Sequence, residues 1–281
     1  CYFPTLNLIY DLIQKTKGKF KISFGITGIF FDQLKRWHPE IIEIFQKLNK
    51  TGCVEFVGET YYHSLSSIYS ISDFKEQVIL HKNLIKKLFN QEPKVFANTE
   101  LIYFNNLTQI VKNLGFEAIL TEGVPWILEW RSPNFLYEDP NKNLKIFLKN
   151  YKLSDDIAFR FSAKWWQEWP LTAEKFTNWL EAHNGNSEVI NLFMDFETFG
   201  EHQWQETGIF EFLKALPFEV LKRKDLEFDL PSKVIKKYPT RGIFSSEKPI
   251  TWADTERDLT AWLGNEMQKE CAEILYSLEK N

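Results

Sequence analysis

Cysteine is scarce in this sequence, and its pattern excludes two kinds of stabilised fold. Three of the 281 residues are cysteines, and Cys1, Cys53 and Cys271 are too far apart for the Cys-x-x-Cys spacing of a zinc site. An odd, widely spaced set also argues against a disulfide framework, so we expect a reducing compartment, the cytoplasm. The five histidines show neither His-x-His nor His-Glu-x-x-His spacing. We therefore expect no metal and no other cofactor.

Long apolar runs and an excess of positive charge are also missing. No stretch is long enough to span a bilayer, so we expect no membrane as partner. The formal net charge is −4, which gives no electrostatic reason to expect nucleic acid as partner. The composition that remains is that of a globular protein, with 44% hydrophobic and 26% charged residues. The length fits one large domain or a domain with an appendage, and the oligomeric state is left open.

Aromatic residues, in contrast, are abundant. The chain has 25 Phe, 10 Tyr and 10 Trp. Most of these rings belong in a core, but Trp is also common where a flat apolar face meets a polar ligand such as a sugar. For Trp165 and Trp166, packing in the core is the alternative to stacking on a sugar. The candidate stacking residues are Trp126, Trp165, Trp166 and Trp252.

Apolar runs alternate with stretches of helical periodicity, which predicts an α/β fold with a mostly parallel sheet. We expect a (β/α) barrel domain without its first strand in residues 1–215, with a doubly wound open sheet as the alternative. Residues 216–281 are expected to form a mostly helical segment that packs on the barrel, nearly all helix over 252–280. Strands are predicted at 21–27, 53–59, 94–100, 116–123, 144–150 and, most strongly, 189–196. Helices are predicted from the first residues of the chain and over 39–50, 72–89, 105–114 and 171–183.

Ionisable residues gather at the ends of these predicted strands, where parallel α/β folds bind their ligands. Taken alone, Glu55 fits a core-edge carboxylate bonded to a backbone amide, and Glu100 fits a helix cap. Taken together, two carboxylates from different strands are what cleavage of a glycosidic bond requires, one as nucleophile or base and the other as acid. The two histidines in the set are candidates for structural or substrate contacts. The strand-end residues are Glu55, Glu59, His63, Glu100, Glu122, Asp195, Glu197 and His202.

Four segments resemble regions of glycoside hydrolase family 57, in its α-amylase-like members. FANTELIY (96–103) and FMDFETFGEH (193–202) resemble two signature motifs, and TGCVEFVGETYYHSL (51–65) resembles a third. TWADTERDLTAWLGN (251–265) is similar to the same branch. The resemblance implies an incomplete (β/α)7 barrel followed by a helical segment. It also implies a retaining mechanism on α-glucans or maltooligosaccharides, without a required metal.

The resemblance assigns roles to individual residues. Glu100 matches the nucleophile, and Asp195 matches the general acid/base. Glu55 and Glu197 match carboxylates that contact the substrate or orient the catalytic pair, and His202 lies in the same motif as Asp195. The first family motif, a histidine-containing strand, and the last, which contributes an aspartate, have no counterpart here. We therefore expect a fragment at both ends.

Several functions remain open at this stage. The amylase-like motifs favour hydrolysis of α-1,4 linkages. A 4-α-glucanotransferase or a branching enzyme shares the first half-reaction, so the catalytic pair alone does not separate these activities. A non-catalytic glucan-binding homologue would keep the aromatic residues, and a carbohydrate deacetylase would need an Asp/His metal cluster. Chain-length preference is also open.

Overall fold

The structure is a computed structural model and describes residues 1–278. Its centre is a set of short parallel strands that follow one another in chain order. β1 pairs with β2, a bridge between Gly58 and Phe96 continues the order to β3, and β3, β4 and β6 pair in parallel. A bridge between Lys149 and Asn191 adds a further segment beside β6. The parallel strands are β1 (Ile22–Phe24), β2 (Val54–Phe56), β3 (Val95–Ala97), β4 (Ala118–Glu122) and β6 (Lys145–Lys149).

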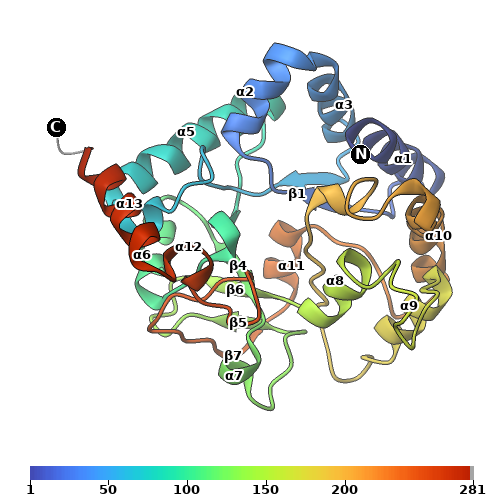
Figure 1. Ribbon diagram of the computed structural model, residues 1–281. Helices are drawn as coiled ribbons and strands as arrows, with labels where there is room; N and C mark the ends of the chain where they lie inside the picture. The colour runs from blue at the N-terminus through green and yellow to red at the C-terminus, as the bar shows by residue number, and fades with distance from the viewer. Residues whose placement is uncertain (279–281) are drawn as a thin grey trace.

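Helices surround these strands, as Figure 1 shows. The predicted 72–89 helix is confirmed as α5 (Ile71–Phe89), which begins where the Ser70 hydroxyl accepts from Asp73 N–H and ends at the left-handed Asn90. The fold class predicted from the sequence, an incomplete (β/α) barrel, is confirmed. The other long helices of the surrounding layer are α1 (Tyr2–Lys15), α2 (Gly28–Trp37), α3 (Pro39–Asn49), α6 (Asn105–Asn113), α8 (Tyr151–Ala158), α9 (Ala173–Glu181) and α10 (Ile209–Leu221). Short α4 (Ser66–Tyr69) and α7 (Pro125–Leu128) lie in the connections.

The prediction of a strand over 189–196 is wrong for most of that segment. Only Asn191 makes a strand bridge, and the Phe193 N–H donates to the Ser154 hydroxyl instead of to a neighbouring strand. The side chains still alternate as in a strand, because Val189 and Phe193 pack on the barrel interior while residues 190, 192 and 194 pack on the helices outside. Extended backbone without a strand on both sides makes few ladder hydrogen bonds, which explains the difference.

The prediction that residues 252–280 are nearly all helical is also wrong in part. Helix occupies α12 (Thr260–Leu263) and α13 (Glu266–Ser277), whereas residues 252–259 form turns. In that turn region the Thr251 N–H donates to the Arg257 carbonyl, and both ends of the region contact the barrel. These long-range contacts outweigh the local helical tendency.

Two strands that the sequence analysis did not anticipate widen the sheet. β5 (Leu136–Glu138) runs antiparallel to β6, and β7 (Thr240–Ile243) pairs in parallel with β5. The segment after residue 215 therefore contributes a strand to the main sheet, and α10 crosses the predicted boundary at that residue. The division into two domains stays a prediction.

The short helix α11 (Pro231–Lys237) packs against the inward face of the strands, near the centre of the ring in Figure 1. Its Val234 and Ile235 join an apolar cluster with residues from several strands or their ends, Val57, Leu120 and Phe147 among them. Because strand side chains alternate, the neighbours two residues away point to the same side. Apolar residues thus fill the middle layer of the barrel, and α11 lies beneath them.

Charged side chains from the strands satisfy both ends of α11. The N–H and hydroxyl groups of Ser232 donate to the Glu55 carboxylate, with the hydroxyl at 2.6 Å. At the other end the Lys145 ammonium donates to the carbonyl groups of Ile235 and Tyr238. A carboxylate at the start of a helix and a cation at its end both complement the helix dipole. Glu55 and Lys145 therefore form the lower polar layer of the barrel.

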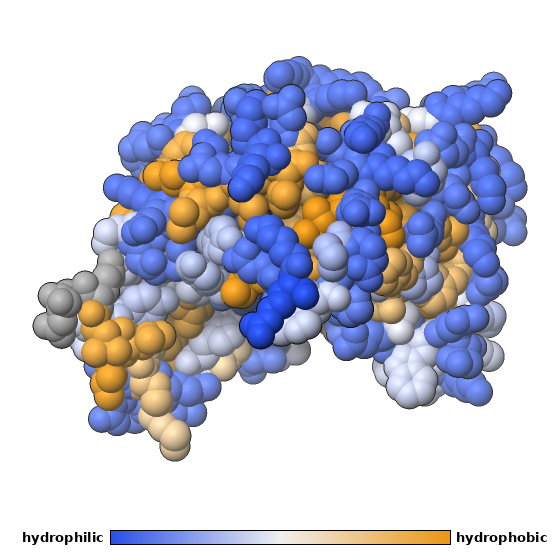
Figure 2. Space-filling model, turned by 90° about the horizontal axis from the view of Figure 1, so that it is seen from above, coloured by the Kyte–Doolittle hydropathy of each residue, from blue (hydrophilic) through white to orange (hydrophobic). Residues whose placement is uncertain are grey.

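Among the exposed apolar side chains of the described residues, three lie on α13. Figure 2 shows apolar atoms beside the grey end of the chain. In α13, Met267 is 74% exposed, Ile274 56% and Leu275 61%. Within residues 1–278, no helix is both long and apolar enough to cross a membrane.

The contact between Glu55 and Ser232 generates a stability prediction. Replacing Glu55 by Ala leaves the buried end of α11 without its acceptor, and we expect the free energy of unfolding to fall by about 1–3 kcal/mol. Urea denaturation measures this change. Glu43→Ala, on an exposed face of α3, is the matched control and should leave the midpoint nearly unchanged. Equal midpoints for the two variants would contradict the role of Glu55 in holding α11.

Candidate active site

Glu100 follows β3 in a tight turn, η1 (Thr99–Leu101), whose backbone is unusual. Both Glu100 and Leu101 have a φ of 53°, a left-handed conformation that is costly for side chains of this kind. Hydrogen bonds hold it: the Asn98 amide donates to the Ile102 carbonyl, and the Thr121 hydroxyl donates to the Leu101 carbonyl at 3.0 Å. Strain of this kind collects at functional sites, where the surroundings fix a side chain in one direction.

Two donors hold the carboxylate of Glu100. His63 Nε2 lies 2.8 Å from Glu100 Oε1, and the Trp252 indole N–H donates to Oε2 at 2.8 Å. The Trp252 backbone N–H also donates to the Glu100 carbonyl at 3.2 Å. Burial favours the neutral form, but the hydrogen bonds from His63 and Trp252 outweigh it and hold the pKa of Glu100 below its usual value. The hydrogen bond to Glu100 in turn raises the pKa of His63, against an opposing effect of burial.

Asp195 opens a loop that is anchored by helices on two sides. The loop begins with η2 (Phe196–Thr198), and the Tyr2 hydroxyl from α1 donates to the Glu197 carboxylate. The Thr5 hydroxyl, also from α1, donates to the Phe199 carbonyl at 2.9 Å. Near the end of the loop, the Gln203 amide donates to the Ala158 carbonyl at 2.9 Å. These contacts fix the backbone on which Asp195 stands.

The turn at Gly200 needs glycine for two reasons. Its φ of +112° is in the range that side chains rarely adopt. A Cβ there would also lie 3.0 Å from Phe210 and 3.1 Å from Cys1. Gly200, which lies in the FMDFETFGEH segment, therefore lets α1 approach the loop closely.

The electrostatic surroundings of Asp195 differ from those of Glu100. Partial burial raises the pKa of Asp195, and the negative charges of Glu197 and Glu100 raise it further. The charges of His202 and Lys149 act in the opposite direction without reversing the shift. The charge of Glu100 acts on Asp195, and Trp252, which is bonded to Glu100, packs against Phe193, two residues before Asp195. One carboxyl is held as an anion and the other is pushed toward its neutral form, the arrangement that acid and nucleophile require.

The other carboxylates and histidines predicted as substrate contacts are distributed around this pair. Glu55 lies below, bonded to Ser232, as the structural interpretation of this residue anticipated. Glu197 is half-buried beside Tyr2, and His202 is exposed on the loop after Asp195. Their contacts with substrate stay predictions, as does that of His63.

The four predicted stacking tryptophans do not lie in equivalent places. Trp126 is 55% exposed on α7, just after β4, and Trp165 is 80% exposed in the segment after α8. Trp166 packs edge-on against Trp179, with ring centroids 6.0 Å apart, and joins the helical core. Trp252 is half-buried and bonded to Glu100. Stacking on a sugar stays a prediction for all four.

Glu122, one of the strand-end residues, belongs to a buried group of charges beside the site whose other members were not singled out from the sequence. Lys149 Nζ lies 3.5 Å from Glu122 and 3.4 Å from Asp155, and Arg257 Nη1 lies 3.3 Å from Glu122. Lys149 also sits 4.8 Å above the Trp252 ring. Its position at the end of a predicted strand is a signal that could have found Lys149. No local signal marks Arg257, because its partner lies 135 residues away. The group pins the turn that carries Trp252.

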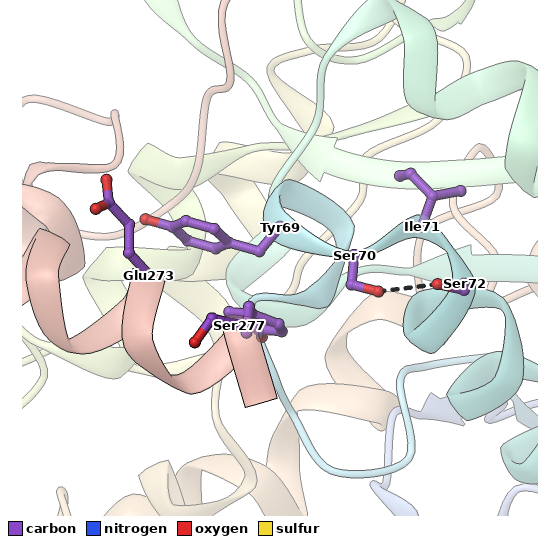
Figure 3. Close-up of a pocket in the computed structure, with 7 residues that line it drawn as sticks. Tyr69, Ser70, Ile71, Ser72, Glu273 and Ser277 are labelled. Atoms are coloured by element: carbon purple, nitrogen blue, oxygen red, sulfur yellow. Dashed lines mark hydrogen bonds between the residues drawn. The ribbon is translucent and has the colours of Figure 1, made fainter. Parts of the chain in front are cut away.

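The structure also has a pocket away from these carboxylates, shown in Figure 3. It has a volume of about 620 Å³ and lies between the start of α5 and α13. Tyr69 and Tyr276 stack there with ring centroids 4.9 Å apart. None of the residues predicted for the site lines this pocket. Across residues 1–278, no group of three or more His, Cys, Asp or Glu side chains is arranged to hold a metal ion.

Comparison with known proteins gives one family and a set of relatives. A family model described as glycosyl hydrolase family 57 matches residues 1–249. A protein of Methanocaldococcus jannaschii with the provisional name alpha-amylase is 50% identical over 283 residues. That match takes in 100% of this chain and 60% of the relative, so the chain spans about three fifths of the relative's length.

Solved structures with low sequence identity share the fold. The 4-alpha-glucanotransferase of Thermococcus litoralis matches with a TM-score of 0.73 at 18% identity, over 89% of this chain and 38% of that chain. A GH57 branching enzyme of Thermococcus kodakaraensis matches with a TM-score of 0.73 at 14% identity, over 95% of this chain and 70% of that chain. At this identity the similarity defines the architecture.

The raised pKa of Asp195 generates a prediction about stability. A carboxyl whose pKa is higher in the folded protein than in the unfolded chain loses stabilising energy as pH rises through that pKa. Asp195→Asn removes the charge, so we expect the variant to unfold at a higher temperature than the unaltered protein near pH 7. Because the residue is partly exposed, the gain should stay below about 1 kcal/mol. The gain should vanish below the usual pKa of aspartate.

Thermal unfolding measured from pH 3 to pH 8 tests this expectation, in steps of roughly one pH unit. Asp11→Asn, on the exposed side of α1, is the control and should show no such dependence on pH. A lower unfolding temperature for Asp195→Asn at pH 7 would contradict the electrostatic description of the site.

Proposed function

The chain belongs to glycosyl hydrolase family 57, and from that premise we propose that it cleaves α-glucans such as maltooligosaccharides at α-1,4 linkages. The proposed mechanism is retaining and uses Glu100 and Asp195. The observation that carries the proposal is that the pKa values of two neighbouring carboxyls are shifted in opposite directions. Hydrogen bonds from His63 and Trp252 lower the pKa of Glu100 against the effect of burial. Burial and nearby negative charge raise the pKa of Asp195. The name of the Methanocaldococcus relative supports the choice of substrate.

In the first step, the Glu100 carboxylate attacks the anomeric carbon while the bond from that carbon to the glycosidic oxygen breaks. The Asp195 carboxyl gives its proton to the departing oxygen, and a covalent glucosyl ester with Glu100 forms. In the second step, Asp195 takes a proton from water, which attacks the same carbon. Glu100 leaves as a carboxylate, and the configuration of the sugar is retained.

The hydrogen bonds on Glu100 act chiefly in the second step of this mechanism. His63 and Trp252 stabilise the carboxylate, so they lower the basicity of the attacking group. The same stabilisation makes Glu100 a better leaving group when water resolves the ester. The donors thus limit the accumulation of the covalent intermediate.

Transfer to another glucan is the second candidate activity, because it shares the first step. The Thermococcus neighbours are named as a glucanotransferase and a branching enzyme, and a sugar hydroxyl would replace water as the acceptor. Exposed or half-buried groups around the pair are proposed to contact the glucan on either route. These are Glu197, His202, Trp126 and Trp165.

A product profile on maltoheptaose tests the proposed function. We expect shorter maltooligosaccharides only, and a loss of activity of roughly a thousandfold or more in Glu100→Gln and in Asp195→Asn. Glu206→Gln, an exposed carboxylate beyond the same loop, is the control and should retain activity. Products longer than maltoheptaose would assign transfer instead. Absence of turnover by the folded protein would overturn the catalytic proposal.

A second prediction concerns the indole N–H of Trp252. Trp252→Phe keeps a ring next to Phe193 but removes the donor to Glu100, so the pKa of Glu100 should rise. We expect the acidic limb of the kcat/KM profile to move to higher pH. We expect kcat to fall roughly tenfold, as for one lost hydrogen bond to a charged group, because that bond stabilises Glu100 as the leaving group of the second step.

Steady-state kinetics across the pH range measures both effects. Trp130→Phe, at a side chain that is 88% exposed, is the matched control and should keep the profile of the unaltered protein. An acidic limb that does not move in Trp252→Phe would show that this hydrogen bond leaves the ionisation of Glu100 unaffected.

A further inference from the structure

One carboxyl near the site, that of Glu59, has no role in the mechanism described above. It stands three residues after the end of β2, on the same side of the chain as Glu55 and Val57, because extended residues two apart share a face. Glu55 holds α11 below, and Val57 packs in the apolar middle layer. The carboxyl of Glu59 is therefore directed to the upper layer of the barrel, where the strands end.

The backbone of Glu59 is fixed by a histidine from the outer layer. The N–H of Glu59 donates to His81 Nδ1 at 3.2 Å, and His81 Nε2 donates to the Ile26 carbonyl at 2.8 Å. Burial lowers the pKa of His81 to about 4, so the imidazole is neutral and accepts at one nitrogen while donating at the other. His81 thereby ties the end of β2 to the end of β1.

The neighbouring strand leaves space for the side chain of Glu59. A Cβ on Gly25 would lie 2.1 Å from Glu59 Oε1, so the carboxyl occupies the volume that a larger residue at position 25 would fill. Alanine at this position would force the carboxyl away. The glycine therefore fixes where Glu59 lies.

On its other side, Glu59 adjoins the turn that carries Glu100. Thr60 and Thr99, one residue from Glu59 and from Glu100, have their hydroxyl oxygens 2.7 Å apart. The hydrogen bond that His63 donates to Glu100 raises the pKa of His63 against the effect of burial, and the charges of Glu100, Glu59 and Asp195 act in the same direction when these carboxyls are ionised. The three carboxyls therefore share one imidazole as their electrostatic neighbour.

Glu59 differs from the other inward carboxylates in having no partner. Glu55 is bonded to Ser232, and Glu122 lies against two cations. Within residues 1–278, the side chain of Glu59 makes neither a hydrogen bond nor an ion pair. Glu59 is half-buried, and its carboxyl oxygens are not among the fully buried atoms without a partner, so a ligand can reach the group and complete it.

The charge state of Glu59 follows from these surroundings. Burial raises the pKa of Glu59 to about 8, and the charge of His63 opposes this only in part. The neighbour from β1 is a glycine, and His81 from α5 is neutral. At neutral pH the group is a carboxylic acid with one O–H donor and one carbonyl acceptor.

We propose that Glu59 is a further substrate-binding residue of this site, which in its protonated form donates a hydrogen bond to a hydroxyl of the glucose unit next to Glu100. Its carbonyl oxygen accepts from the adjacent hydroxyl of the same ring. A donor and an acceptor side by side match two neighbouring hydroxyl groups of a pyranose. This inference rests on the proposed function, since it takes a glucan as the ligand.

Two substitutions of Glu59 separate its chemistry from its volume. Gln keeps one donor and one acceptor, whereas Ala removes both. In an Asp195→Asn background, which keeps Glu100 and His63 together, titration calorimetry measures the affinity for maltoheptaose. We expect Glu59→Ala to bind about tenfold more weakly at pH 6.5, and Glu59→Gln to bind within about twofold of the background protein.

The pH dependence of binding gives an independent test. Affinity of the background protein should fall as pH rises through about 8, where Glu59 ionises and loses its donor, and Glu59→Gln should remove this fall. Unfolding measurements test the ionisation of Glu59 in the absence of any ligand. The stability gained by Glu59→Gln should grow from the usual pKa of glutamate up to about pH 8 and then level off.

The outcomes distinguish this inference from the proposed function. In one outcome, the unaltered protein cleaves maltoheptaose, but the folded Glu59→Ala variant binds it as tightly as the Asp195→Asn background protein does. Glu59 then has no part in binding, and the proposed function stands. The inference is also overturned if the fall in affinity as pH rises through about 8 persists in Glu59→Gln. If the unaltered protein neither binds nor cleaves maltoheptaose, the proposed function fails first and this inference fails with it.

Discussion

The hydrogen bond from the Trp252 indole to Glu100 joins parts of the chain that are 152 residues apart, and the geometry of the site depends on it. Glu100 stands in a strained turn that offers few contacts of its own. Trp252 supplies a backbone and a side-chain donor to it, and its ring packs against Phe193, two residues before Asp195. One side chain thus connects the two halves of the proposed catalytic pair. The buried charges of Glu122 and Arg257 hold in place the turn that carries it.

The alternation of side chains along short parallel strands distributes polar groups to two levels of the barrel. At the lower level, charges of opposite sign receive the two ends of α11, whose apolar face closes the middle layer. At the upper level, the same alternation delivers Glu59, Glu122 and Lys149 near the catalytic pair. Most of these groups are paired, which offsets the cost of burying them. Within residues 1–278, the carboxyl of Glu59 has no partner, and we propose a ligand as its partner.

The opposite shifts in the pKa values of Glu100 and Asp195, the proposed catalytic pair, have a structural origin on each side. Donors converge on Glu100 from a loop after β2 and from the turn before α12. Within residues 1–278 no such donor reaches Asp195, which stands in a loop with Glu197, whose negative charge adds to the effect of burial. The membership of the chain in glycosyl hydrolase family 57 gives these features a chemical meaning, because cleavage of a glycosidic bond needs an ionised and a protonated carboxyl together.

Sequence alone determined the features that depend on local pattern. Hydrophobic periodicity located β1 to β4, β6 and the helices α1, α3, α5, α6 and α9, but not α2, α8 or α10. The apolar runs placed Glu100 after a strand and Asp195 at the end of an extended segment. Tertiary structure decided everything that rests on contacts between distant segments. β5 and β7 are short and gain their stability from pairing, residues 252–259 abandon a helical tendency for contacts with the barrel, and the 189–196 segment lacks the neighbours of a full strand. The partners of Glu100, Glu55 and Arg257 lie 37 to 177 residues away, where no local periodicity reaches.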